Sequence, residues 1–535
     1  MTKKKKLAAI LLSCLPGALG YSAPTHAVHL NPHGRGQAWI YPYYGVNGGN
    51  QTIISVVNTA NDVKAIRVRF LESRNSRSVI DFNLYLSPFD VWTGSVFALD
   101  ANGGANLVTL DSSCTVPPIK GGTALPSVGG NRYVPFRNVQ YTGAFADGGG
   151  GSLARTREGH VEIIEMGTLL GGRDAHLLAD EATRGGEVVP PNCAALVAAW
   201  SSGGAWIGAG AAAGTNAPSG GFFGSGAVVD VANGTMLAYN ADALDGFYFT
   251  GDPADDIHFR PVFEHPTLNN ARSGSRTPPV TSFALTGGSA PSVVASSWIR
   301  TAPNDLAGVD AVSAALMVDA IYNEYTSDVS LGAATEWIVT FPTKRFYVDH
   351  VEFGGAASLA VGPVAGTRQS LPPFSGFGFT ALSGGARVAS FACEDLSITL
   401  TDRGAGIVWE SQFGEILPNK LGLCEATNTV TFDQSGSESA ILGTPSTRYR
   451  NLDGPFVSGS AHMRFTQSIG TGVEPDFIVA RTATASDGDA YAGLPVTGFA
   501  AVSIVNRDAA PGMLANYAGV FRHRGTTAIT PSETD

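Results

Sequence analysis

Clustered carboxylates and histidines are the residues of this chain best suited to hold a metal ion. The segment 251–256 (GDPADD) precedes His258, and Asp487 and Asp489 lie two positions apart. Hard cations such as calcium are bound by clustered carboxylate oxygens. Neither segment has the alternate-residue spacing of a dedicated calcium loop, and short polar residues of this kind also make solvated turns. We therefore interpret both segments as turns and predict no metal site and no cofactor.

Two further patterns resemble functional motifs. His29 and His33 lie close together near the start of the chain, but two histidines alone rarely form a metal site. Residues 494–498 (LPVTG) match the LPxTG pattern of sortase anchoring, yet charged residues at 507 and 508 interrupt the apolar span that such a signal needs. Pro495 before a Val- and Ile-rich run indicates the start of a strand instead. Neither pattern supports a site or an anchor.

No catalytic motif is found in the sequence. GxSxG, HExxH, Walker, zinc-binding Cys/His and EF-hand patterns are all missing. The glycine-rich segments 148–151 and 208–214 lack the context of a phosphate or dinucleotide loop. A triad can also assemble from distant residues, so a hydrolase stays an alternative. We name no catalytic residue and expect no catalytic activity.

Exposed aromatic side chains would favour glycan binding. The chain has seven tryptophans, accompanied by three tyrosines near the start, and such rings can stack on sugars. In a β-sandwich, tryptophan more often fills the core between the sheets, so we predict a core role for most of these residues. The residues concerned are Trp39, Trp92, Trp200, Trp206, Trp298, Trp337, Trp409, Tyr41, Tyr43 and Tyr44.

Residues 1–27 have the features of a secretory signal peptide. Four lysines precede a short apolar run, and residues 25–27 (THA) offer small side chains at the expected cleavage positions. We expect an exported protein at the cell surface or outside the cell, with the periplasm as an alternative. Removal of this segment would lower the formal charge from −11 to −15, and an acidic surface repels phosphate backbones. No nucleic-acid partner and no later transmembrane segment are expected.

The four cysteines beyond the predicted signal peptide indicate two disulfides, because an even number in an exported chain usually pairs completely. Three pairings are possible. We favour Cys114–Cys193 and Cys393–Cys424, since each pair then lies inside one expected domain. None of the four belongs to a CxxC pair, so redox and zinc chemistry are not expected.

The elements that would position any site are predicted to be strands. Residues 64–71 (KAIRVRFL) alternate apolar and basic side chains, which is typical of a strand with one buried and one wet face. Residues 52–58 (TIISVVN) precede them across a short polar turn, and we predict a hairpin. Residues 81–86 and 91–97 continue the pattern. Short strands at this spacing predict a mainly β protein of immunoglobulin-like sandwiches with glycine-rich loops and few short helices.

The rest of the chain is organised in the same way. A domain boundary is predicted near residue 220, after a Gly/Ala-rich stretch, which gives an N-terminal sandwich at 28–220 and one or more β-rich domains at 221–535. Asn233 and Gly234 form a strong hairpin signal. Short helices are expected at 174–183 and 192–200. Residues 309–325 fit a strand or a helix, with the strand favoured, and residues 336–348 are strand-like on both sides of Pro342.

A resemblance adds to this interpretation. The segments HLNPHGRGQAWIYPYYG (29–45), SVVNTANDVKAIRVRFLESRNSRSVIDFNLYLSPFDVW (55–92), TEWIVTFPTKRFYVD (335–349) and LPVTGFAAVSIVN (494–506) are similar to a group of exported proteins of Gram-negative bacteria that has no assigned activity. The resemblance implies export and a shared architecture, and no functional residue follows from it.

These observations favour a secreted or cell-surface structural or interaction protein without catalytic activity. The alternative is an extracellular protein that binds or processes glycans. Cell-surface components, glycans and copies of the chain itself all stay open as partners.

Overall fold

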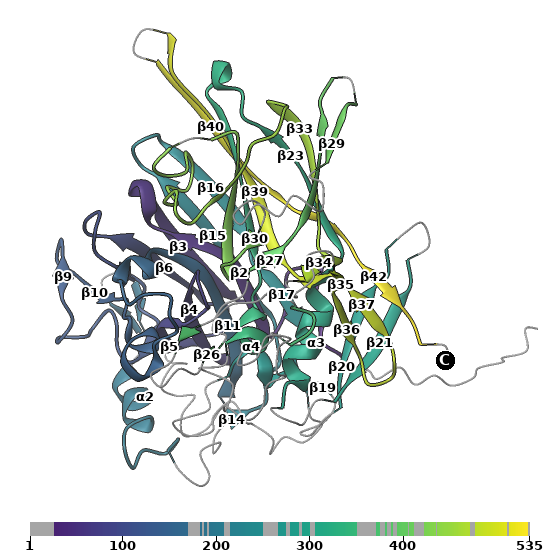
Figure 1. The fold of residues 1–535 in the computed structure, drawn as a ribbon. Coiled ribbons are helices and arrows are strands. Elements are labelled where there is room, and N and C mark those ends of the chain that lie inside the picture. Colours follow the sequence, from purple (N-terminus) through teal and green to yellow (C-terminus); the bar gives the residue numbers. More distant parts are fainter. Residues whose placement is uncertain are drawn as a thin grey trace, which may run out of the picture.

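The fold is known from a computed structural model that describes residues 26–169, 182–184, 187–189, 192–207, 215–249, 266–273, 279–287, 291–299, 305–349, 371–374, 380–381, 387–388, 393–404, 406–410, 422–434, 436–470, 477–510 and 513–532. Antiparallel sheets dominate these residues (Figure 1). This confirms the predicted mainly β fold, while the immunoglobulin-like strand order stays a prediction.

Two large sheets form the N-terminal half. The first sheet has the strand order β1 (His29–Leu30), β17 (Asp242–Asp245), β2 (Ala38–Gly45), β11 (Glu158–Leu169), β4 (Val63–Glu72), β5 (Ser78–Leu86), β8 (Cys114–Val116), with β14 (Thr215–Asn216) beside β11. The second sheet has the order β16 (Thr235–Asn240), β15 (Phe222–Asp230), β3 (Gln51–Asn58), β6 (Val91–Ala98), β7 (Ala105–Val108), β10 (Asn131–Pro135), β9 (Ser127–Val128).

The predicted hairpin between residues 52–58 and 64–71 is wrong. β3 lies in the second sheet and β4 in the first, so the polar link between them crosses from one sheet to the other. The buried Asn58 side chain holds this crossing next to a second crossing, the link from β5 to β6. Its Nδ2 donates to the carbonyl oxygens of Asp62 in the first link and Ser87 in the second, both at 2.8 Å. Polar turn residues suit a hairpin and a crossing equally well, so the turn sequence could not distinguish them.

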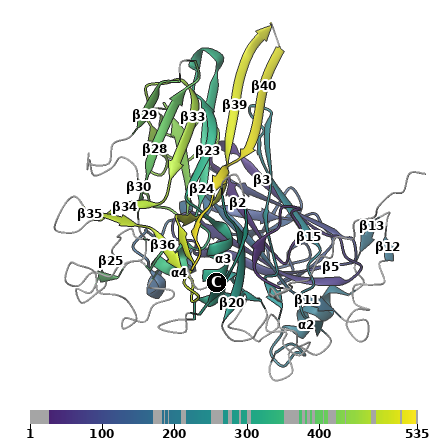
Figure 2. The same cartoon turned by 90° about the vertical axis from the view of Figure 1, so that its right-hand side faces the viewer.

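Two further sheets form the C-terminal half. The third sheet has the order β29 (Val408–Glu410), β28 (Ser397–Asp402), β33 (Ser458–Arg464), β23 (Ala320–Thr326), β41 (Arg524–Thr526). The fourth sheet has the order β32 (Arg450–Leu452), β31 (Thr427–Phe432), β24 (Ala333–Thr340), β39 (Thr497–Ala510), β40 (Met513–Arg522). Figure 2 shows the hairpin of β39 and β40 projecting beyond the other strands. Shorter pairs include β20 (Val280–Leu285) with β21 (Val293–Trp298).

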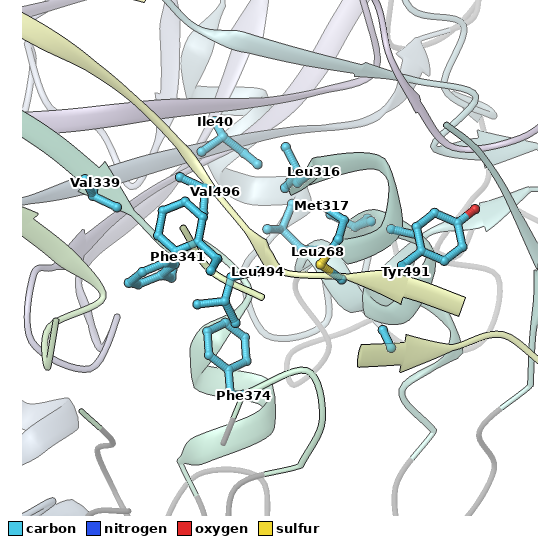
Figure 3. Close-up of a cluster of buried hydrophobic side chains, with 14 of the residues drawn as sticks. Ile40, Leu268, Leu316, Met317, Val339, Phe341, Phe374, Tyr491, Leu494 and Val496 are labelled. Atoms are coloured by element: carbon cyan, nitrogen blue, oxygen red, sulfur yellow. The ribbon is translucent and has the colours of Figure 1, made fainter. Parts of the chain in front are cut away.

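The fourth sheet belongs to two hydrophobic cores at once. On β24, Trp337 and Val339 point into a core with the third sheet, whereas Ile338 points into the core between the first and second sheets. On β39, Ala500 faces the first of these cores and Phe499 the other. Figure 3 shows part of the C-terminal core around Phe341 and Leu494. A sheet buried on both faces makes the two halves one packed body.

Two segments differ from the expectations. Residues 309–325, for which a strand was favoured, form helix α3 (Ala307–Leu316) followed by β22 (Met317–Val318) and β23. The helical spacing lets Asp310 and Ser313 meet one hydroxyl, that of Tyr347, each at 2.9 Å, whereas a strand would point them to opposite faces. Beyond Pro342 the chain forms helix α4 (Lys344–Val348), not the expected strand.

The predicted helices, the hairpin at Asn233 and Gly234, and the domain boundary can also be compared with the structure. Helix α2 (Cys193–Ala199) occupies the predicted helix at 192–200, and β15 and β16 form the hairpin around Asn233 and Gly234. The predicted helix at 174–183 lies mostly outside the described residues. Because β15, β16 and β17 complete the two N-terminal sheets, the pairing runs past the boundary predicted near residue 220 and reaches Asp245.

Both disulfides are present in the sequential pairing. Cys114–Cys193 links β8 to α2 across 79 positions, and Cys393–Cys424 spans 31 positions in the C-terminal half. Cys114 is buried in a small separate cluster with Tyr85 and Trp206. The first disulfide therefore attaches the α2 segment to the edge of the first sheet.

Candidate functional site

The short sequence motifs have structural roles where they are described. The side chain of Asp489 is buried and accepts a 2.6 Å hydrogen bond from Ser296, while Asp487 accepts one from the backbone amide of Ser297. Leu494 and Pro495 form the buried strand β38 (Leu494–Pro495), and Thr497 is also buried. The LPVTG segment is thus part of the core. The acidic segment 251–256 and His258 lie outside the described residues.

The histidines near the start of the chain do not meet. Nδ1 of His29 is 2.9 Å from the carbonyl oxygen of Ala27, and the backbone amide of His33 donates to Asn31. Among the residues that the structure describes, no group of three or more His, Cys, Asp or Glu side chains is placed to bind a metal ion.

Five of the seven tryptophans are core residues. Trp200 and Trp409 are partly exposed, and Trp200 donates a hydrogen bond to the hydroxyl of Tyr85. The tyrosines at 41, 43 and 44 are also buried. A sugar-stacking platform made of these aromatic residues therefore finds no support. The buried tryptophans are Trp39, Trp92, Trp206, Trp298 and Trp337.

The outer face of the first sheet is buried, which corrects the expectation of a wet face on β4. Arg67 and Arg69 point away from the N-terminal core, yet they are only 4 % and 8 % exposed. Arg67 is paired with Asp81 at 2.7 Å. Next to these arginines, Arg345 of α4 lies 3.5 Å from Glu162 of β11. The alternation of β4 was identified correctly, but the second face is covered by the C-terminal half.

Charged pairs join the two halves across the outer face of the first sheet, and we call this set of buried charges the charge layer. Arg77 forms a bidentate ion pair with Asp349, in which its Nε lies 2.6 Å from Oδ2 and its Nη2 lies 2.8 Å from Oδ1. Arg448 lies 3.2 Å from Glu158, which also accepts a hydrogen bond from Thr444 at 2.8 Å. These groups are buried or nearly so, and a buried charge is tolerated only when it is paired. The layer therefore joins the two halves of the fold through buried ion pairs.

In the same layer a histidine contacts a hydroxyl group, an arrangement that some catalytic sites use. Nδ1 of His160 lies 3.1 Å from the hydroxyl of Thr427, and both side chains are buried. Burial, together with the nearby Arg345 cation, lowers the pKa of His160 to about 3. A base with such a low pKa is poorly matched to proton abstraction at neutral pH. We interpret this contact as structural.

The lowered pKa of His160 makes stability depend on pH. In the unfolded chain the imidazole has a pKa near 6.5 and is protonated below it, while the folded protein keeps the ring neutral. The folded protein therefore has its full free energy of unfolding above about pH 6.5, where His160 is neutral in both states. That free energy falls as the pH drops below this value, because only the unfolded chain binds the proton. We expect the free energy of unfolding to decrease by roughly 2 kcal/mol between pH 6.5 and 5 through this residue. Urea unfolding of wild type and His160→Asn at both pH values measures it, and an equal pH dependence in the two proteins would contradict the assignment.

The second sheet carries the accessible feature that the sequence analysis missed. Four of its seven strands, β16, β15, β3 and β6, turn alternate side chains away from the core, and none of these outward positions holds a charged residue. We call this surface the uncharged face. It consists of Met236, Ala238 and Asn240 of β16; Phe223, Ser225, Ala227 and Val229 of β15; Gln51, Ile53, Ser55 and Val57 of β3; and Val91, Thr93, Ser95 and Phe97 of β6.

Strand register divides the uncharged face into apolar and hydroxyl rows. Val57 stands between Val91 and Phe223, which makes one row apolar. In the neighbouring row Ser55 stands between Thr93 and Ser225, and the two serine hydroxyls are 3.0 Å apart. Several apolar members are well exposed: Ile53 at 40 %, Phe223 at 43 %, Val91 at 45 % and Met236 at 58 %.

Strand β40 presents further exposed apolar side chains close to this face. Met513, Tyr517 and Phe521 project from one side of the strand, and each is more than half exposed. The Asn516 side chain donates to the carbonyl oxygen of Asn233, in the turn between β15 and β16, at 2.8 Å. β40 therefore lies beside the edge of the second sheet, as Figure 1 also shows.

A cavity of about 600 Å³ opens where the two halves meet, and we call it the junction cavity. It is lined by the β2–β3 turn at 46–51, by residues 98–101 after β6, by Arg157, and by residues from 438 to 448 of the C-terminal half. Ligand sites of proteins commonly have volumes of about 300 to 1,000 Å³. No short motif marks these segments, because they are far apart in the sequence.

Comparison of the chain with protein-family models, with curated proteins and with solved structures gives no match. No described helix is both long and apolar enough to cross a membrane. The candidate sites therefore rest on geometry alone: the uncharged face and the junction cavity are accessible, and the charge layer is buried.

Proposed function

We propose that the chain is a secreted or cell-surface interaction protein without catalytic activity, and that its uncharged face binds the same face of a second copy. The observation that carries this proposal is the lack of charge at all outward positions of four adjacent strands. A face with exposed Ile53, Val91 and Met236 gains free energy when it is removed from water.

The charge of the chain favours a second copy as the occupant. The formal charge is −11, so two copies repel each other over most of their surfaces. The uncharged face is a region where they can meet without burying like charges, which would be costly. The hydroxyl row at Ser55 and Ser225 can exchange water for hydroxyl groups of the other copy.

The size of the face sets the expected affinity. Four strands about 4.8 Å apart and seven residues long cover roughly 400 Å². Stable interfaces bury about 800 Å² on each partner, so a single pair of faces should associate weakly. Copies displayed close together on a surface would gain strength through their high effective concentration. Tyr517 and Phe521 of β40 would enlarge the contact if the second copy extends over them.

Sedimentation velocity over a range of protein concentrations tests the proposal. Wild type is expected to self-associate reversibly, and Ile53→Glu or Val91→Glu should weaken association at least tenfold, because each places a charge in the contact. Val293→Glu is the matched control, since Val293 is a strand residue that is 64 % exposed on the separate β20–β21 pair. A wild type that stays monomeric, or equal association of Ile53→Glu and Val293→Glu, would refute it.

Fractionation of the native host addresses the compartment. We expect the protein in the medium or on the cell surface, as a dimer that dissociates on dilution, because a face that binds its own copy closes a pair. A soluble monomer in the medium would instead direct attention to the glycan-binding alternative.

A further inference from the structure

The junction cavity is preformed by contacts between distant segments. Arg157 lies at its floor, and its guanidinium donates to the side chain of Asn47 at 2.8 Å and to the carbonyl oxygens of Val46, Asp100 and Gly103, each at 3.0 Å. One side chain thus fixes the β2–β3 turn and the loop after β6 together. Such a site pays little ordering cost when it binds a ligand.

The cavity wall that comes from the C-terminal half is held by direct contacts with the β2–β3 turn. Gly443 packs so closely against Gly48 that an added Cβ would lie 2.4 Å from the backbone nitrogen of Gly48. The Asn50 side chain donates to the carbonyl oxygen of Ile441 at 3.0 Å. The cavity walls therefore come from both halves of the molecule and are held in register by direct contacts.

Both cations that line the cavity are already engaged. The donor groups of Arg157 are engaged by carbonyl oxygens, and Arg448 pairs with Glu158 and Glu425 at 3.2 and 3.6 Å. Asp100 and Glu438 are exposed at the rim. These lining residues therefore offer an anionic ligand no free cation.

The groups left for a ligand are mainly hydrogen-bond acceptors. Asp100 and Glu438 offer carboxylate oxygens at the rim. Asn50 also lines the cavity, but it is only 4 % exposed and its Oδ1 is buried, so this side chain shapes the wall. Leu99, 52 % exposed, adds an apolar patch at the mouth.

We propose that the junction cavity binds a neutral, hydroxyl-rich ligand of one or two sugar rings. Hydroxyl groups of the ligand can donate to the carboxylates of Asp100 and Glu438, and the apolar face of a sugar ring suits Leu99. The site is separate from the uncharged face and does not depend on self-association.

Saturation-transfer NMR with glucose, galactose, N-acetylglucosamine and cellobiose tests this binding. At about 10 mM, which exceeds even a weak dissociation constant of about 1 mM, at least one of these probes should give a signal. Ala101→Trp fills the mouth from an exposed position and should abolish the signal, while Glu438→Ala should weaken binding at least fivefold. Ala232→Trp, at an exposed turn position away from the cavity, is the control and should bind like wild type.

Three results would overturn the proposal: no signal from any probe, undiminished binding by Ala101→Trp, or stronger binding of the charged analogues glucosamine and galacturonate than of the neutral sugars. Circular dichroism and urea unfolding confirm that each variant is folded. Ile53→Glu, which disrupts the uncharged face, should keep full sugar binding, so failure of one proposal leaves the other intact.

Discussion

Replacing both Cys114 and Cys193 with serine is expected to lower the free energy of unfolding by about 4 to 5 kcal/mol. The disulfide closes a loop across 79 positions, and in the chain-entropy model its main effect is to restrict the unfolded chain. Cys114 is also buried beside Tyr85 and Trp206, so a serine hydroxyl there adds a desolvation cost. Guanidinium unfolding followed by circular dichroism measures the change.

The second disulfide is the internal control for this prediction. Cys393–Cys424 spans only 31 positions, and its serine variant should lose about 3 to 4 kcal/mol. Each variant removes one disulfide, so the difference between their losses in free energy of unfolding reports the difference in loop length. A larger loss from the shorter loop, or a loss below about 1 kcal/mol for Cys114 and Cys193, would contradict the entropic account.

Replacing Arg155 with methionine is expected to destabilise the fold by about 3 to 5 kcal/mol. The buried guanidinium bridges two carboxylates, with its Nη2 at 3.0 Å from Glu72 and 2.7 Å from Asp147. Both carboxylates have fully buried side chains, so removal of the cation leaves two buried negative charges without the guanidinium that bridges them. Because Glu72 also accepts hydrogen bonds from the backbone amides of Arg74 and Asn75, the β4–β5 turn should loosen as well.

An exposed pair provides the matched comparison. Arg272 lies 3.4 Å from Asp305, whose side chain is 42 % exposed. Arg272→Met should therefore cost less than about 1 kcal/mol in a urea unfolding experiment run on both variants. Acidification should partly rescue Arg155→Met, because without Arg155 burial raises the pKa of Asp147 and its protonation removes a buried charge. Equal losses in the two variants would show that burial of the Arg155 cluster does not control its strength.

The sequence by itself determined the local elements and the covalent links. Alternation with a period of two located β3, β4, β5 and β6 because a pleated strand turns successive side chains to opposite faces. The Asn233–Gly234 turn was recognisable because few residues adopt its backbone angles, and Gly234 has a φ of 63°. The disulfide pairing followed from keeping each pair within one part of the chain.

Only the tertiary structure decided which surfaces are buried. The charges of Arg67 and Arg69 indicated a wet face, yet both side chains are buried. Arg67 pairs with Asp81 of the neighbouring strand, but Arg345 of α4, the charge that acts on Arg69, comes from the C-terminal half. The same long-range packing made 307–316 a helix, because Asp310 and Ser313 share Tyr347. The uncharged face required four strands to be placed side by side before its lack of charge became visible. Period and propensity are properties of neighbouring residues, whereas burial depends on which distant segment packs against them.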